Sequence, residues 1–510
     1  MTPYRIASVA GSCIALCAGA ASAQLTVTPN VNVTKQTGDQ AESSISINPT
    51  NPQNVFVLYN DLTAGMGGAF TTNGGTIWNK RAIPSGADTL TSSIGDPTVC
   101  FDNFGNLFLG HLTNPNIGTQ IGISTNGGAS FSTVATPWTS GTDQPTITAG
   151  QGAVWLSVNQ GGGNNCWRAP VTGLGVVGAG SITGILPSSN SGTNGEFGDI
   201  AIGPGGRVAV IYQNSGSGNG PDTLFMNFDS DGLGVNPFGA RLTVTSTNVG
   251  AFDTIPAQPS RTVDAEAGLA YDTTGGPHNG RLYLLYTDET VNENNDMNVM
   301  FRFSDNNGTS WSAPVKINDD ATTRSQFLPK LAIDPVTGHL AAIWYDARNS
   351  ASNNTAEIWG TASRDSGATW LPNVKISAGV CNAVGGNSFD FGDYSGLSCY
   401  NDVFWATWAD NSNSTGDNPN GTGAMDIYVG KVTIAPLAAT CYPNCDNSTT
   451  PPVVNTSDFT CFLQQYSAAT VLPAAQQQTH YANCDGSTTF PQVNTSDFTC
   501  FLQKYAAGCS

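Results

Sequence analysis

Charge is scarce in this chain, and positive charge is the scarcest. Only 11% of the 510 residues are charged, with 18 Lys and Arg against 37 Asp and Glu, which gives a formal net charge of −19. A nucleic-acid-binding protein needs a basic stripe that displaces the counterions of the phosphates. The sequence offers no such stripe, so nucleic acid is not expected as a partner.

Long apolar runs are also missing after the first 23 residues, where no stretch approaches the ~20 apolar residues of a membrane-spanning helix. Met1 to Ala23 carries Arg5, an apolar run from Ile6, and Ala21-Ser22-Ala23 before Gln24. This is the pattern of a secretory signal peptide with a small-residue cleavage site. We therefore expect a secreted or cell-surface protein without a transmembrane segment.

What the sequence has instead is a repeated turn. Residues 363–370 read Ser-Arg-Asp-Ser-Gly-Ala-Thr-Trp. In such a turn the Asp side chain accepts bonds from backbone amides, Gly takes the φ > 0 position and Trp begins the outgoing strand. Looser copies, each with Asn in place of Asp, stand at 71–78, 124–131 and 304–311. Four such turns in the same phase after an apolar run indicate a repeated supersecondary unit.

This octapeptide resembles the Asp-box, and residues 24–435 resemble the Asp-box (BNR-repeat) β-propellers of the sialidase-like superfamily. Only residues 363–370 match the motif at every position, since Asn replaces Asp at 73, 126 and 306. The resemblance implies an all-β propeller whose box turns lie on the outer rim of the blades, away from the central mouth that binds ligands. It implies little about function.

A second apolar strand recurs seven times in this region. The starts are 47 to 74 residues apart, which leaves room for four short strands per repeat and for loops of varying length. Seven blades are therefore favoured, with the six blades typical of sialidases as the alternative. The strands are 55–61, 107–113, 154–160, 208–214, 282–288, 340–346 and 403–410.

The seventh repeat has too few strands before the composition changes. Residues 25–34, in contrast, alternate as a strand does and have no partner in the first repeat. An open blade would leave a sheet edge unpaired. We therefore expect residues 25–34 to complete the seventh blade.

A second, shorter repeat begins after a linker at residues 436–440. Residues 444–469 recur at 483–508, and each copy has a polar loop followed by apolar residues at helical spacing, with Ser457 and Ser496 as the expected N-caps. The duplicated loop-helix resembles a dockerin. It implies a small two-helix dockerin-like domain at 441–510, with a cell-surface or cohesin-like partner.

The dockerin resemblance also implies calcium, Ca²⁺, as a possible cofactor. The sequence departs from the pattern at the first ligand position, which is Tyr442 or Tyr481 instead of Asp. As an alternative, the same side chains accept bonds from backbone amides and cap the helices. The implied ligands are Asn444, Asp446, Asn455 and Asp458 in the first copy and Asn483, Asp485, Asn494 and Asp497 in the second.

Six cysteines fall in the last 70 residues. In a small exported domain they predict three disulfides, each worth roughly 2 to 4 kcal/mol. Of the fifteen connectivities we expect Cys445–Cys461, Cys484–Cys500 and Cys441–Cys509. In the propeller we expect Cys381–Cys399, since both flank one short strand, and Cys100 with Cys166 as the remaining pair.

Carboxylates recur shortly before the first strand of six of the seven repeats, where loops enter the mouth of a propeller. Either they accept bonds from amides of neighbouring blades, or they form an acidic mouth that binds a cation or a neutral sugar. They are Glu42, Asp96, Asp143, Glu196 with Asp199, Glu266 with Asp264, and Asp393.

The resemblance also implies which residues a sialidase site would need. Sialidases bind the substrate carboxylate with three arginines and use a Tyr nucleophile with acidic partners. The candidates are Arg261, Arg324, Tyr394, Asp96 and Glu266. Arg81 lies in the outermost strand of the first blade and is not a candidate. The first hypothesis is therefore a secreted propeller that binds an extracellular glycan or polysaccharide at its mouth and is tethered by the C-terminal module. The second is a sialidase-like glycoside hydrolase of the exo-α-sialidase type.

Overall fold

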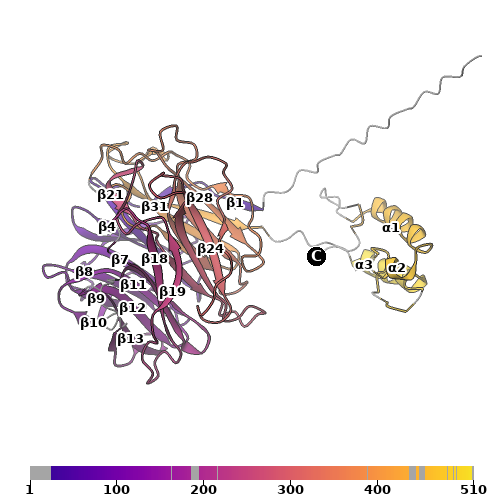
Figure 1. Cartoon of the computed structure of the whole chain (residues 1–510), viewed down its shortest axis with the longest axis horizontal. Coiled ribbons are helices and arrows are strands. Elements are labelled where there is room, and N and C mark those ends of the chain that lie inside the picture. Colours follow the sequence, from indigo (N-terminus) through magenta and orange to yellow (C-terminus); the bar gives the residue numbers. More distant parts are fainter. Residues whose placement is uncertain are drawn as a thin grey trace, which may run out of the picture. The chain divides into compact units, whose positions relative to one another are not determined.

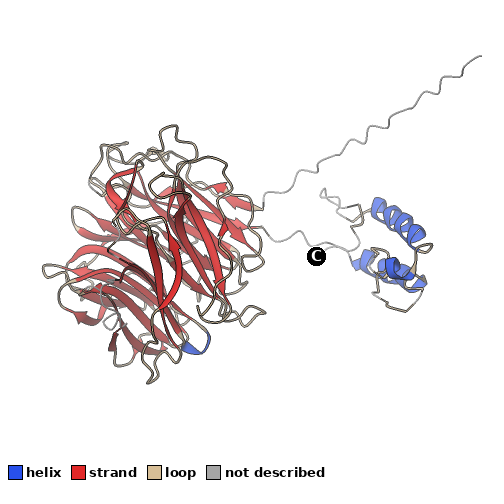
Figure 2. Ribbon diagram, in the orientation of Figure 1, coloured by secondary structure: helices blue, strands red, loops and turns tan. Residues whose placement is uncertain are grey.

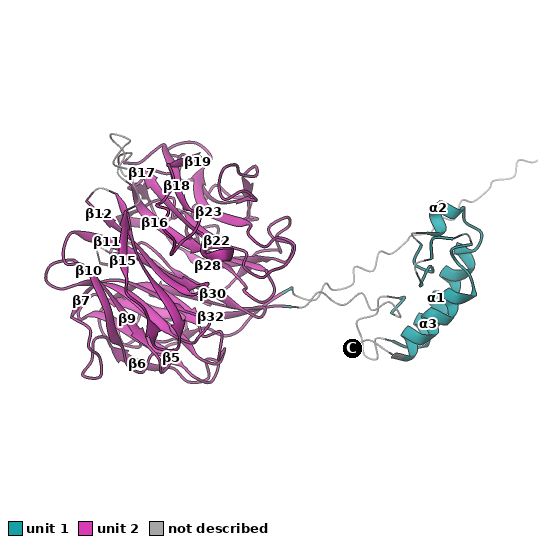
Figure 3. Ribbon diagram, turned by 90° about the horizontal axis from the view of Figure 1, so that it is seen from below, with its two compact units in different colours: residues 1–24, 435–510 teal, residues 25–434 magenta. Residues whose placement is uncertain are grey.

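The computed structural model describes residues 24–435 except 162, 185–194, 215, 217 and 388, and then 444–446 and 454–507 except 479, 486 and 490. The chain divides into two compact units (Figure 3): Leu25–Ile434 forms one, and residues 435–510 belong to the other. The predicted signal peptide, residues 1–23, and the predicted linker, residues 436–440, lie outside the described residues.

The larger unit is a seven-bladed β-propeller, as predicted. Figures 1 and 2 show its strands fanned into antiparallel sheets, each of which runs from an innermost to an outermost strand. Blade 1 consists of β3 (Gln40–Ile47), β4 (Val55–Asp61), β5 (Gly65–Thr71) and β6 (Asn79–Ala82). Blade 2 consists of β7 (Ser93–Phe101), β8 (Leu107–Thr113), β9 (Thr119–Ser124) and β10 (Ser132–Trp138). Blade 3 consists of β11 (Thr142–Gly150), β12 (Ala153–Gln160) and β13 (Asn164–Gly173), and β13 pairs with the short β14 (Val176–Val177) and β15 (Ser181–Gly184).

Blades 4 to 6 follow the same order, with a 3₁₀ turn, η1 (Pro204–Gly206), inside blade 4 and a hairpin inserted before blade 5. Blade 4 consists of β16 (Gly195–Ile202), β17 (Val208–Asn214), β18 (Asp222–Asp229) and β19 (Leu242–Thr247). Blade 5 consists of β22 (Gly268–Tyr271), β23 (Leu282–Glu289), β24 (Met297–Ser304) and β25 (Val315–Lys316). Blade 6 consists of β26 (Gln326–Ile333), β27 (Leu340–Asp346), β28 (Glu357–Ser363) and β29 (Val374–Lys375). The inserted hairpin is β20 (Asp253–Ile255) and β21 (Gln258–Val263).

Blade 7 is closed by the N-terminal segment, which confirms the predicted role of residues 25–34. Its first three strands are β30 (Gly396–Tyr400), β31 (Val403–Asp410) and β32 (Asp426–Ile434). The short strands β1 (Leu25–Val27) and β2 (Val31–Asn32) then pair antiparallel with β32, Leu25 opposite Ile434 and Val31 opposite Val429. The backbone groups along that edge of β32 are thereby paired.

The second strand of each blade is buried on both faces, which explains its continuous apolar sequence. Val55, Phe56, Val57 and Leu58 of β4 are all 0% exposed, and β17, β23 and β27 follow the same pattern. The hydrophobic core therefore lies between neighbouring blades.

The four octapeptide turns share one hydrogen-bonding geometry, and each joins a third strand to an outermost strand. In 363–370 the Ser363 hydroxyl accepts from Gly367 N–H at 2.8 Å, and Asp365 Oδ1 accepts from Thr369 N–H at 2.8 Å. Asn306 takes the place of the Asp in the 304–311 turn and accepts from Ser310 N–H at 2.9 Å. The amide oxygen therefore replaces the carboxylate without loss of the turn.

The described C-terminal residues form three helices, α1 (Thr456–Ala469), α2 (Ala474–Gln477) and α3 (Thr495–Ala507). Phe462 of α1 stacks on Phe501 of α3 with ring centroids 3.8 Å apart. The predicted N-cap at Ser457 is wrong: α1 begins two residues earlier than that cap implies, at Thr456, and Asn455 caps it by accepting from Ser457 N–H. Asn494 likewise accepts from Ser496 N–H at 2.8 Å. The two predicted helices are α1 and α3, and the four-residue α2 lies between them.

The predicted cysteine pairs have different outcomes. Disulfides join Cys445 to Cys461 and Cys484 to Cys500. Cys441 and Cys509 lie outside the described residues.

The predicted Cys381–Cys399 bond is wrong, because both thiols are free. Cys381 pairs through its backbone with Ala356 beside blade 6, whereas the Cys399 thiol, in the innermost strand of blade 7, lies 3.9 Å from an oxygen of Asp334. Cys381 therefore lies beside blade 6 and Cys399 within a strand of blade 7, so the two do not flank one short strand. Cys100 and Cys166, in blades 2 and 3, are free as well.

Candidate functional site

A β-bulge interrupts the innermost strand of five blades at the same place, and with the matching position in the other two blades it defines a ring of seven residues. In β3, β7, β11, β16 and β26 the register with the second strand shifts across two residues. The first of these has φ between 45° and 56°, as Glu42 and Asp96 illustrate with 52° and 51°. The same position in blades 5 and 7 lies two residues before the first paired residue. We call this set the mouth ring: Glu42, Asp96, Gln144, Phe197, Glu266, Leu328 and Tyr394.

Two cavities of the propeller meet at this ring. The mouth cavity, of about 350 Å³, is lined by Gln144, Phe197 and Leu328 of the ring together with Phe252 and Arg261. The channel cavity, of about 260 Å³, is lined by Gln144, Phe197, Glu266 and Tyr394 of the ring and by inner-strand residues such as Lys330. The ring therefore has room for a ligand of moderate size.

Arg261 lies at the centre of the polar contacts in the mouth. It comes from the inserted β21, and its Nε and Nη2 donate to the two carboxylate oxygens of Asp393. Nη2 also lies 3.1 Å from Oε1 of Glu42, a side chain that is 0% exposed. The single guanidinium is thus shared by the side chains of Asp393 and Glu42.

A segment of blade 7 holds this arginine from the other side. Asp390 Oδ2 accepts from the backbone N–H groups of Ser260 and Arg261 at 2.7 and 2.8 Å. The ring of Phe389 lies 4.5 Å from the guanidinium carbon of Arg261. Two insertions, one before blade 5 and one before β30, are therefore fastened together beside the mouth.

The mouth-ring carboxylates of blades 1 and 2 are biased toward the protonated state. Burial, reinforced by the charges of Asp393 and Asp96, raises the pKa of Glu42 well above its usual value. Burial and the neighbouring Asp143 raise the pKa of Asp96 to about 8, although Asp96 accepts from the Gln144 N–H at 3.1 Å. A carboxylic acid that stays protonated at neutral pH can donate a hydrogen bond or a proton.

Glu266 faces a cation instead. Lys330 Nζ lies 3.5 Å from its Oε1, and burial raises the pKa of Glu266 to about 7 against the opposing effect of Lys330. Burial disfavours the charge of Lys330, but the carboxylates of Glu266 and Asp199 outweigh it and raise the lysine pKa. Asp199 itself is tied to the backbone, since it accepts from Leu269 N–H at 2.7 Å.

Tyr394 is a neutral phenol in this environment. Its hydroxyl lies 3.4 Å from the backbone oxygen of Pro97, to which it donates. Burial and the nearby carboxylates of Asp96 and Glu42 raise the tyrosine pKa well above its ordinary value. The Tyr394 hydroxyl therefore acts as a hydrogen-bond donor at the mouth ring, and its ionisation is disfavoured.

Four of the five residues predicted as catalytic candidates lie together at the mouth. Asp96, Glu266, Tyr394 and Arg261 gather at the mouth ring, together with Glu42 and Asp393. Arg324 does not join them. It borders a separate depression with Arg348, and its Nη2 donates to the backbone oxygen of Ala351 at 2.7 Å.

Sequence reasoning did not single out Phe197, Phe252, Phe389, Asp390 or Lys330 as site residues. A usable signal was present at three blades: the dipeptides Asp96-Pro97, Gln144-Pro145 and Leu328-Pro329 stand at the bulge, where a sheet tolerates proline. The insertions carry no such repeat, because they occur only once.

The loops predicted to bind calcium already use their buried carboxylates. Asp458 accepts from the N–H groups of Asp446 and Asn455, at 3.1 and 2.8 Å, and Asp497 accepts from the equivalent pair in the second copy. These bonds belong to the alternative in which the side chains satisfy the backbone. Within the described residues no three His, Cys, Asp or Glu side chains are grouped as a metal site requires. Calcium stays a prediction, and the hydrogen bonds present do not favour it.

No family model matches the chain, and no curated protein matches its sequence significantly. Solved structures with a similar fold include a protein of unknown function from Dyadobacter fermentans, 11% identical with a TM-score of 0.44 over 81% of this chain and 100% of that one. A GH93 α-L-arabinofuranosidase of Fusarium graminearum is 12% identical, with a TM-score of 0.41 over 66% of this chain and 98% of that one.

The lectin BP39L of Burkholderia pseudomallei is also 12% identical, with a TM-score of 0.44 over 66% of this chain and 84% of that one. At these identities the likeness is one of fold alone. Among the described helices none is long and apolar enough to cross a membrane.

Proposed function

We propose that this propeller binds a neutral carbohydrate at its mouth. The observation that carries the proposal is the state of Arg261, whose guanidinium is engaged by Asp393 and Glu42. A mouth whose arginine is already paired with carboxylates offers acceptors for sugar hydroxyls. It offers no unpaired guanidinium at this point for an anionic sugar acid.

An apolar surface beside these acceptors supports the proposal. Phe252 is 45% exposed in the mouth cavity, and its ring meets that of Phe197 edge to face with centroids 5.5 Å apart. Ligand sites commonly pair such aromatic faces with a few placed polar groups. A sugar ring can lie on Phe252 while its hydroxyls reach Asp393 and Asp143.

The test is calorimetric titration with a panel of neutral oligosaccharides. Phe252→Ala should weaken binding about tenfold or more, since it removes a stacking surface worth about 1.5 kcal/mol. The matched control is Phe104→Ala, because Phe104 is 43% exposed in the turn between β7 and β8, at the other end of its blade. If no neutral saccharide binds at millimolar concentration, or if both variants behave alike, the mouth is not a carbohydrate site.

Sialidase activity is not supported by this mouth, because Arg324 lies elsewhere and Arg261 is paired. Hydrolysis of a fluorogenic sialoside should be undetectable or very weak. Robust turnover that disappears in Arg261→Ala and Tyr394→Phe would overturn this expectation and make the protein a sialidase.

One observation favours a second candidate, hydrolysis of neutral glycosides. Burial and the neighbouring Asp143 raise the pKa of Asp96 to about 8, so Asp96 is protonated at neutral pH. A protonated carboxyl is one of the two groups that an acid/base glycosidase requires. Turnover of neutral nitrophenyl glycosides that is lost in Asp96→Asn or Glu266→Gln, with sugar binding retained, would support this candidate.

The sequence supports two further parts of the proposal. Residues 1–23 direct export, and the C-terminal unit tethers the propeller to a cell-surface or cohesin-like partner in the manner of a dockerin. The Asp-box assignment rests on the octapeptides and on their shared turn geometry.

A further inference from the structure

A second depression lies on blade 6, outside the mouth cavity. Its volume is about 450 Å³, and it is lined by Thr322, Thr323, Arg324, Arg348, Asn349 and Ser350. Residues 321–324 lead into the innermost strand β26, and residues 348–351 follow β27. The depression is therefore built from loops at the same end of the strands as the mouth.

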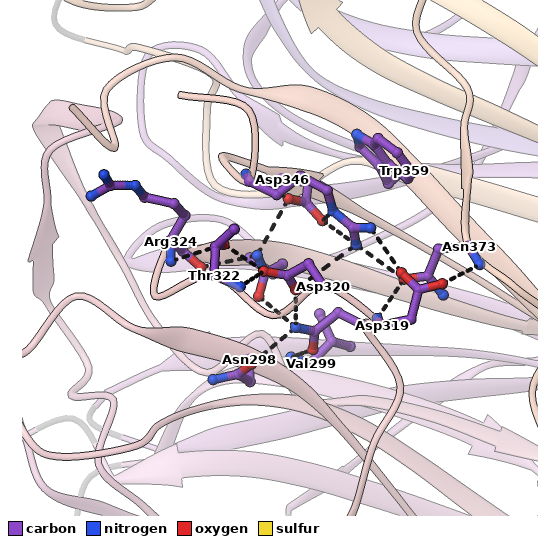
Figure 4. A network of polar contacts seen from close by, with 12 residues as sticks. Asn298, Val299, Asp319, Asp320, Thr322, Arg324, Asp346, Trp359 and Asn373 are labelled. Atoms are coloured by element: carbon purple, nitrogen blue, oxygen red, sulfur yellow. Dashed lines mark hydrogen bonds and ion pairs between the residues drawn. The ribbon is translucent and has the colours of Figure 1, made fainter. Parts of the chain in front are cut away.

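The loop that carries Arg324 is held by the polar network of Figure 4. Asp320 accepts from Thr322 N–H at 3.1 Å and from Asn318 Nδ2 at 2.8 Å. Arg348 contacts Asp319 and Asp346 at 2.8 Å each and lies 4.0 Å from the Trp359 ring. The carboxylates of this region are thus engaged by Arg348 and by the loop itself.

Arg324 points away from that network, as Figure 4 shows. Its Nη2 is anchored to the Ala351 oxygen at 2.7 Å, and its own backbone oxygen accepts from Gln326 Nε2 at 2.9 Å. Among the described residues, no Asp or Glu oxygen lies within ion-pair distance of its guanidinium.

Three other cations at this end of the strands contrast with Arg324. Lys35 is paired with Asp417, Arg261 with Asp393 and Arg348 with Asp319. In a chain with a net charge of −19, Arg324 is a positioned guanidinium whose charge is not neutralised by a neighbour. A fixed guanidinium binds carboxylate and sulfate groups well because its planar fork matches two oxygens at once.

We propose that Arg324 binds an anionic substituent, a carboxylate or a sulfate ester, on the same glycan chain whose neutral residue occupies the mouth. The inference rests on the proposed carbohydrate function and adds the substrate class, an acidic glycan with sparse charges. Sparse charge is required, because the overall negative charge of the protein repels a dense polyanion.

The experiment compares an acidic tetramer, made of three neutral sugars and one uronate, with its methyl-esterified form, which has the same backbone and no charge. Binding to the full chain is measured by calorimetry at 20 and 150 mM NaCl. Arg324→Gln should weaken binding of the acidic tetramer about tenfold at low salt and leave the esterified form unchanged. A neutral tetramer bearing one sulfate ester then distinguishes sulfate from carboxylate as the preferred group.

The matched control is Arg207→Gln. Arg207 is also a half-buried arginine whose Nε donates to a backbone oxygen, that of Pro204, but it lies at the opposite end of the strands, after β16. An equal effect of both substitutions would mean that net charge alone matters, and would overturn the site. Equal losses for the charged and esterified tetramers, or failure of the wild type to bind either anionic probe, would overturn it too. Weaker binding of the uncharged, esterified tetramer by Phe252→Ala tests the mouth separately.

Discussion

At the scale of single residues, the mouth ring has a constant backbone and a varied chemistry. Six blades hold the ring residue at φ between 42° and 56°, although that residue is Glu, Asp, Gln, Phe or Leu. Such a conformation is costly for any residue other than Gly and persists only where the surroundings fix it. The bulge therefore sets the position, and the side chain in each blade is left to determine what the mouth binds.

Asp96 gives this arrangement a measurable pH dependence. Its pKa in the folded protein is about 8, above the ordinary value of 3.8, so the folded state retains a proton that the unfolded state loses. The stability contributed by the protonated group is complete below about pH 4 and is lost as the pH rises through 8. The difference in unfolding free energy between wild type and Asp96→Asn should therefore change in favour of the variant between pH 5 and 8. Urea titrations at several pH values measure it, and parallel pH profiles for the two proteins would contradict it.

Gly367 allows the packing of one octapeptide turn to be tested by adding a single Cβ atom. It has φ of +86°, and an added Cβ would meet the Phe301 ring of the preceding blade at 2.3 Å. Gly367→Ala should cost about 2 to 4 kcal/mol, from backbone strain together with the displaced ring. Gly416→Ala is the matched control, because Gly416 has φ of +74° with open space around it. Thermal unfolding should show a larger loss at 367, and equal losses would mean that the contact with Phe301 is unimportant.

At the scale of elements, the strands buried between blades could be predicted and the insertions could not. The second strands are apolar on both faces, so sequences such as 55–61 and 340–346 show their bounds directly. The hairpin β20–β21 and the segment before β30 occur once, carry no period, and contact each other only in the fold. The sequence showed that Arg324 lies just before the innermost strand of blade 6, but it did not predict where the side chain lies in the fold. A loop residue outside the alternation of a strand has no predictable side-chain direction.

Closure of blade 7 is the element most open to a direct test. Deletion of residues 24–36 removes β1 and β2 and leaves the outer edge of β32 unpaired. It also removes the bonds that Asn32 and Thr34 donate to Asp426, at 2.6 and 2.9 Å. The propeller should lose several kcal/mol of stability relative to the chain that begins at Gln24. An unchanged denaturation midpoint would show that this strand does not close the ring.

At the scale of the whole molecule, two units are stabilised by different means. The propeller buries continuous apolar strands between its blades, whereas the C-terminal unit has a small core around Phe462 and Phe501. A core of that size gives little stability by itself. Each disulfide of this unit closes a sequence separation of 16 residues between a loop and the helix that follows it, and so supplements the core.

Residues 435–510, expressed under oxidising conditions, should therefore fold without the propeller and unfold cooperatively. Reduction should abolish that transition, because removal of native disulfides from a small domain typically costs about 2 to 5 kcal/mol. The double variant Cys445→Ala, Cys461→Ala separates the loss of one bond from effects of the reductant. A chelator should leave the transition in place, since Asp458 and Asp497 already accept backbone N–H groups. If the chelator alone unfolds the oxidised unit, calcium holds these loops, and the hydrogen bonds found here describe only the metal-free form.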